Sequence, residues 1–150
     1  MEPVFSAVFF VTLAEMGDKT QLLAMALAAR YRIKDVLTGI FLATVLNHGL
    51  AVAVGDFVPG LVPFSYIQAA TSLSFIAFGL WTLKGDKLAG EDKRKTRFGP
   101  LGTIIVVFFL AELGDKTQLA TMALAAKYQA PLLILIGTTA GMLIADMIGI

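Results

Sequence analysis

The sequence contains two nearly identical copies of one nineteen-residue segment. The first copy, Leu13–Tyr31, reads LAEMGDKTQLLAMALAARY, and the second, Leu110–Tyr128, reads LAELGDKTQLATMALAAKY. The copies are offset by 97 positions, and fifteen of the nineteen residues are identical. Chance does not produce such a match, so the chain is an internal duplication. Beyond this segment the similarity fades to glycine spacing and one polar pair, in which Asn47–His48 corresponds to Ala145–Asp146.

Both copies lie within long apolar stretches. The chain is 57% hydrophobic and only 15% charged, with a mean hydropathy of +0.81. Soluble domains are about 45–50% apolar and about 25% charged, so this chain has too few charges to cover a water-facing surface. A membrane-spanning helix needs about 20 mostly apolar residues. The sequence predicts an all-α integral membrane protein with five spans, at about Pro3–Ala29, Val36–Val58, Phe64–Leu83, Leu101–Ala126 and Pro131–Ile150.

Charge and cysteine content exclude several classes of protein. Twelve Lys and Arg against eleven Asp and Glu give a net charge of +1, which excludes a strongly basic nucleic-acid binder. Cysteine is absent, so disulfides, thiolate metal sites and a cysteine nucleophile are excluded. The stretch Val4–Ala14 has the length of a signal-peptide core, but Glu2 stands where a basic residue is expected. We therefore expect no cleavage there.

The duplication also predicts the topology. If the copies lie on the first and fourth spans, each repeat contains three spans, and the repeats cross the membrane in opposite directions, as in many transporters. Residues 1–83 then form the first repeat, 84–99 a linker and 100–150 the second repeat. Nine Lys and Arg follow the first and third spans, and only Lys127 lies on the other side. By the positive-inside rule, the 84–99 loop is cytoplasmic and the N-terminus is outside.

Each copy places ionisable residues inside an apolar span, where each costs about 2.5–3.5 kcal/mol on insertion scales. Four carboxylates and two ammonium groups give these segments a charge of −2. A negative site of oxygen ligands predicts a bound cation, and hard divalent ions such as Ca²⁺ and Mn²⁺ take such ligands. The carboxylates are Glu15, Asp18, Glu112 and Asp115, and we expect Lys19 and Lys116 to pair with them.

The spacing of these residues allows two interpretations. On a continuous helix Glu15 and Asp18 share one face, as ligands of one ion would, and Thr20 and Thr117 point away. Alternatively, each Asp-x-x-Gln is a capping box after a glycine helix stop, and the aspartate caps a half-helix. Glu15 and its counterpart have no capping role in either case. The additional candidate ligands are Gln21, Gln118, Asn47, His48 and Asp146, and Gly137-x-x-x-Gly141 suits close helix packing.

The duplicated E-x-G-D-K-T-Q resembles the signature E-x-G-D-(K/R)-(T/S) of a membrane family that contains Golgi calcium/manganese transporters, chloroplast manganese transporters and bacterial manganese exporters. Both copies match at every signature position. The resemblance implies a divalent-cation/proton antiporter whose acidic cation-site residues match Glu15, Asp18, Glu112 and Asp115. The resemblance implies an arrangement of three plus three membrane spans, as in other members of the family. The fifth span predicted here reaches Ile150, so the second repeat is expected to lack its last helix.

We therefore predict a multi-pass carrier, in the inner or plasma membrane if bacterial, that exports Mn²⁺ or Ca²⁺ from the cytoplasm. Protons are exchanged because they compete for the same carboxylates. The expected partners are the metal ion, protons, the lipid bilayer and further copies of the chain, with no nucleic acid, no cofactor and no enzymatic activity. One alternative is a non-transporting assembly subunit, which the charge of −2 disfavours. An intramembrane hydrolase would need a nucleophile–base pair, and His48 alone is poor support for one.

Overall fold

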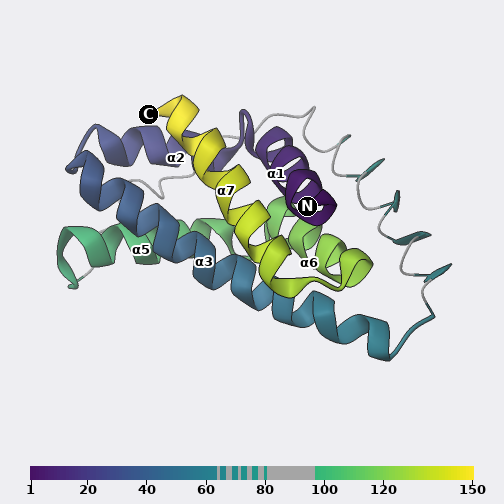
Figure 1. Cartoon of the computed structure of the whole chain (residues 1–150). Coiled ribbons are helices and arrows are strands. Elements are labelled where there is room, and N and C mark those ends of the chain that lie inside the picture. Colours follow the sequence, from purple (N-terminus) through teal and green to yellow (C-terminus); the bar gives the residue numbers. More distant parts are fainter. Residues whose placement is uncertain (64, 67–68, 71, 74–75, 78–79, 81–96) are drawn as a thin grey trace.

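The computed structural model is all-helical in the part of the chain that it describes, which comprises residues 1–63, 65–66, 69–70, 72–73, 76–77, 80 and 97–150 (Figure 1). This part contains six α-helices, one 3₁₀ turn and no strand, which confirms the predicted helical class. The predicted third span Phe64–Leu83 and the 84–99 loop lie largely outside the described residues. The elements are α1 (Glu2–Glu15), α2 (Lys19–Ala28), α3 (Ile33–Phe57), η1 (Val58–Gly60), α5 (Gly99–Glu112), α6 (Lys116–Tyr128) and α7 (Pro131–Gly149).

The first and fourth predicted spans are each broken into two helices at the signature glycine. Gly17 has φ of +79° and Gly114 has φ of +78°. This left-handed conformation costs other L-residues about 1–2 kcal/mol, and glycine adopts it freely. The chain therefore leaves α1 after Glu15 and enters α2 at Lys19 in a new direction. The expectation that Glu15 and Asp18 share one face of a continuous helix is wrong, because α1 ends at Glu15 and Asp18 is the N-cap of α2.

Two helices in the described part are long and apolar enough to cross a membrane, at Ile33–Gly60 and Pro131–Gly149. The surface of α3 has the inverted pattern of a membrane helix. Its exposed face carries large apolar side chains four residues apart, and its buried face carries polar Asn47 and His48. Polar groups on the inside and apolar groups outside are typical of a helix in lipid. This row of exposed apolar residues comprises Leu42, Leu46, Leu50 and Val54.

Helices from the two halves of the sequence pack against each other in a reciprocal way. The first helix α1 lies along α7, and α5 lies along α3 (Figure 1). Glycines permit both contacts: a Cβ on Gly137 would lie 2.6 Å from Ala7 Cβ, and one on Gly141 would lie 2.8 Å from the Val8 carbonyl oxygen. A Cβ on Gly39 would overlap the Ile104 side chain. Close packing at Gly137-x-x-x-Gly141 is thus confirmed.

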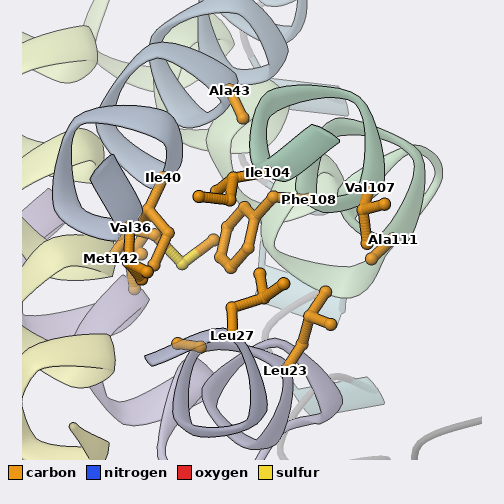
Figure 2. Close-up of a cluster of buried hydrophobic side chains, with 12 residues drawn as sticks. Leu23, Leu27, Val36, Ile40, Ala43, Ile104, Val107, Phe108, Ala111 and Met142 are labelled. Carbon is orange, nitrogen blue, oxygen red and sulfur yellow. The ribbon is translucent and has the colours of Figure 1, made fainter. Parts of the chain in front are cut away.

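A buried apolar cluster joins helices of both halves. Figure 2 shows the Phe108 ring at its centre, facing Ile104, Leu27 and Met142. These four residues come from α5, α2 and α7, and α3 contributes Val36, Ile40 and Ala43. In a soluble protein, burying a large apolar side chain stabilises the fold by about 1.5–3 kcal/mol through its transfer out of water. Between helices in lipid, the same side chain stabilises the fold through van der Waals packing. Because the cluster joins the two halves, it fixes the position of one helix break relative to the other.

Candidate metal centre

Each helix break is closed by the glutamine at the end of the signature. The Gly17 N–H donates to Gln21 Oε1 at 2.9 Å, and the Gly114 N–H donates to Gln118 Oε1 at 2.7 Å. An unpaired N–H at membrane depth would cost several kcal/mol, which explains a polar side chain here. In the capping box considered above, glutamine would bond the N–H of its own N-cap aspartate. The structure differs from a capping box, because the glutamine side-chain oxygen accepts from the N–H of the glycine that precedes the aspartate.

The two copies of the motif are linked by reciprocal ion pairs. Lys116 Nζ pairs with Asp18 Oδ1, and Lys19 Nζ lies 3.5 Å from Asp115 Oδ2. The lysine of each copy therefore contacts the aspartate of the other. The pairs differ in burial, because the Lys116 side chain is 3% exposed and that of Lys19 is 28% exposed. Both aspartates occupy N-cap positions, and Asp115 Oδ1 also accepts from the Lys116 N–H at 2.6 Å.

The two signature glutamates are the last residues of α1 and α5, and both are fully buried. Thr20 Oγ1 donates to Glu15 Oε2 at 2.5 Å and lies 3.3 Å from Asp18 Oδ2. The expectation that Thr20 points away from Glu15 is wrong, because it assumed a continuous helix. Its counterpart Thr117 is also buried, but its hydroxyl has no hydrogen-bond partner among the described residues. The two halves thus share a backbone design and differ in side-chain bonding.

Several buried carboxylate oxygens have no hydrogen-bond partner in the described part of the chain. They are Glu15 Oε1, both oxygens of Glu112, both oxygens of Asp146, and Asp115 Oδ2, which has only the ion pair with Lys19. Buried anions without partners are costly, and they require protons or a cation. This arrangement of carboxylates can therefore bind either protons or a cation.

The middle of α3 and the C-terminal part of α7 contact the motif segments. Asn47 Nδ2 donates to the Phe109 carbonyl oxygen at 2.9 Å, and its Oδ1 lies 3.4 Å from Gln118 Nε2. At the equivalent place in the other half, Gln21 Nε2 donates to the Ala145 carbonyl oxygen at 2.7 Å. His48 Nε2 lies 3.9 Å from Glu112 Oε2. The two backbone acceptors, the carbonyl oxygens of Phe109 and Ala145, could not be identified from the sequence. The correspondence of Asn47 to Ala145 in the repeat did indicate which parts of α3 and α7 lie near the motifs.

The conformation described does not hold a closed coordination shell. Among the described residues, no three His, Asp or Glu side chains converge closely enough to enclose a metal ion together. Asp18 and Asp115 face the lysines of the opposite copy, while the glutamates are the last residues of α1 and α5. The structure brings the predicted site residues into one region and leaves them separate within it.

Comparison with known proteins identifies the class of protein. The family model described as "Divalent cation/proton antiporter GDT1" matches residues 3–89 and 100–150. The chain belongs to this family. The match includes both motif copies and all five predicted spans, and between its two segments it omits only 90–99, within the predicted linker. This chain is thus a membrane divalent-cation/proton antiporter by family, which confirms the resemblance drawn from the duplicated motif.

Relatives of this antiporter occur in bacteria and plants. A "Putative manganese exporter" of Vibrio cholerae is 45% identical over 139 residues, covering 91% of this chain and 69% of the relative. A GDT1-like protein of Synechocystis is 34% identical over 146 residues, covering 83% of this chain and 70% of that protein. A GDT1-like protein of Oryza sativa is 31% identical over 154 residues, covering 83% and 54%. No solved structure matches the chain significantly.

Proposed function

We propose that this antiporter exports Mn²⁺ from the cytoplasm in exchange for protons, with Glu15, Glu112, Asp18 and Asp115 as the ion-binding carboxylates. The observation that carries the proposal is the set of buried carboxylate oxygens at the two helix breaks that have no hydrogen-bond partner in the described part. The choice of Mn²⁺ over Ca²⁺ is supported by the name of the Vibrio cholerae relative. Ca²⁺ is the second candidate ion, because oxygen ligands suit it as well.

The charges of the motif support exchange. Four carboxylates and two ammonium groups leave a charge of −2, which one divalent ion or two protons neutralise. Ligands must be deprotonated to bind metal, so protons arriving from outside release the ion there. The lysines complete the cycle. Each lysine pairs with the opposite aspartate while no ion is bound, and the entering ion displaces the lysine from that aspartate. This step explains how separate carboxylates come together on the ion.

We also propose that the two repeats are inverted, with the N-terminus outside and the 84–99 loop in the cytoplasm. The reciprocal packing of α1 on α7 and of α5 on α3 supports a two-fold relation between the halves. The reciprocal Lys–Asp pairs and the nearly equal φ angles at the two glycines support it too. In inverted repeats the site lies at the repeat interface, and access alternates by rocking one repeat against the other.

Flux measurements in proteoliposomes test the function. With Mn²⁺ inside and an acidic exterior, wild-type protein should release Mn²⁺ and take up protons, and Glu112→Gln should abolish both fluxes while still inserting. Glu2→Gln removes an exposed carboxylate from α1 outside the motif, so it should transport at the wild-type rate. Wild-type flux in Glu112→Gln would exclude this glutamate from the site, and flux independent of the pH gradient would exclude proton exchange.

A further inference from the structure

The single histidine of the chain is buried beside the proposed site without a hydrogen-bond partner. His48 lies on the inner face of α3 and is fully buried. Neither Nδ1 nor Nε2 has a hydrogen-bond partner among the described residues. A neutral imidazole carries one donor and one acceptor, and buried polar groups are normally bonded. Its neighbour Asn47 follows that rule, since its Nδ2 donates to the Phe109 carbonyl oxygen at 2.9 Å and its Oδ1 has a longer contact of 3.4 Å with Gln118 Nε2. The two open nitrogens of His48 therefore call for an explanation.

The nearest acidic group has the same property. Glu112 Oε2 lies 3.9 Å from His48 Nε2, and both oxygens of Glu112 lack a partner in the described part. This distance is too long for a hydrogen bond, which spans about 2.7–3.2 Å. Two ligands each about 2.1 Å from one ion lie between about 3 and 4.2 Å apart, depending on the angle at the ion. The nitrogen and the oxygen are therefore separated as two ligands of one ion would be.

We propose that His48 Nε2 is a ligand of the transported ion together with Glu112, and that it selects first-row transition-metal ions over Ca²⁺ and Mg²⁺. This inference rests on the proposed function. Ca²⁺ and Mg²⁺ take oxygen ligands, whereas imidazole suits transition-metal ions. A nitrogen ligand therefore raises the affinity for Mn²⁺ relative to that for Ca²⁺. A nitrogen ligand strengthens the binding of Co²⁺ and Ni²⁺ even more than that of Mn²⁺. The concentrations of these ions in the cell therefore determine which one is carried.

The repeat gives this ligand to one half only. The residue that corresponds to His48 in the second repeat is Asp146, whose two buried oxygens have no partner in the described part. His48 of the first repeat lies 3.9 Å from Glu112 of the second, so the Glu112 side of the proposed site offers nitrogen and oxygen donors, and the chain has no second histidine for the Glu15 side. His48 lies outside both motifs and beside only one of their glutamates, so a substitution there tests selectivity separately from the carboxylates.

Electron paramagnetic resonance gives a direct test in the wild-type protein. His48 is the only histidine of the chain, so protein purified through a histidine-free tag and grown with ¹⁵N-histidine is labelled at one imidazole. We expect bound Mn²⁺ to show a nitrogen coupling that changes between ¹⁴N and ¹⁵N samples. Bound Mn²⁺ without such a coupling would overturn the role of His48 and leave the carboxylate site intact. Protein that binds no Mn²⁺ at all would overturn the proposed function and this inference together.

Selectivity measurements give a second test. In His48→Gln an amide replaces the imidazole, and the ratio of Mn²⁺ to Ca²⁺ transport should fall at least tenfold, with Ca²⁺ transport retained. Val52→Ala, one turn further along the buried face of α3, removes volume without changing a donor and should leave the ratio unchanged. An unchanged ratio in His48→Gln would refute the selectivity role. Where His48→Gln does not fold, the isotope experiment on the wild type decides.

Discussion

The two signature lysines occupy the same position in nearly identical motifs, but the structure predicts that they differ in their effect on stability. Lys116 pairs with Asp18 and is 3% exposed, whereas Lys19 lies 3.5 Å from Asp115 and is 28% exposed. Replacing each in turn with Met removes the charge and keeps much of the apolar stem. The sequence alone gives no reason for the two variants to behave differently.

The size of the difference follows from burial. Removing one partner of a buried pair leaves an uncompensated charge and costs about 3–5 kcal/mol. Removing one partner of a partly exposed pair costs about 1 kcal/mol or less, because water screens the remaining charge. Lys116→Met should therefore be less stable than Lys19→Met by about 2–5 kcal/mol. At about 2–4 °C per kcal/mol for a chain of this size, the melting temperatures should differ by about 4–20 °C.

Thermal unfolding of the purified protein in detergent, followed by circular dichroism and by the monodisperse fraction, measures this difference. The double variant Asp18→Asn/Lys116→Met is the matched control, because it removes both charges and should recover most of the lost stability. Equal melting temperatures for Lys116→Met and Lys19→Met would refute the assignment of burial to one pair. A double variant as unstable as Lys116→Met would show that the loss arises from packing rather than from charge.

Three further predictions test the helix breaks, the competition and the topology. Gly17→Ala and Gly114→Ala should each lose about 1–2 kcal/mol in unfolding measurements, since φ is positive there and space is open, whereas Gly49→Ala in the middle of α3 should be neutral or stabilising. Calorimetric Mn²⁺ affinity should fall as pH is lowered from 8 to about 6, because protons compete for the ligands; affinity independent of pH would contradict shared carboxylates. A cysteine introduced at Gly90 should resist impermeant reagents added outside intact cells; efficient labelling would reverse the orientation.

The sequence predicted the duplication, the helical class and the family, because each depends on composition or on a long motif. It left open the structural role of each glycine, because a glycine that breaks a helix and a glycine that allows two helices to approach look alike in sequence. Gly17 adopts a positive φ and breaks a helix, whereas Gly137 lies inside α7 and lets α1 approach. Periodicity places both in apolar stretches. Only tertiary packing determines whether the missing side chain serves backbone conformation or close contact.

That single ambiguity accounts for the errors at the site. Helical periodicity put Glu15 and Asp18 on one face and Thr20 on the other, and a break at Gly17 invalidates both inferences. The pairing of each lysine with a carboxylate was predicted as a type of contact. Its partner, the aspartate of the opposite motif, could not be read from spacing, because the contact joins residues 98 positions apart in the Lys116 pair.

The halves of the site differ although their motifs are nearly identical, and the difference originates in the helices that follow. Gln118 contacts the Asn47 side chain, and Gln21 bonds the Ala145 backbone, because alanine offers no side-chain acceptor. The residue after each of these positions is His48 in one half and Asp146 in the other. In an inverted-repeat carrier the repeats exchange conformations between the two access states. Chemically equal halves would make those states equal in energy. Under the proposed inverted arrangement, the divergence of α3 and α7 removes that equality, because the site has the His48 imidazole from one repeat and the Asp146 carboxylate at the corresponding position of the other.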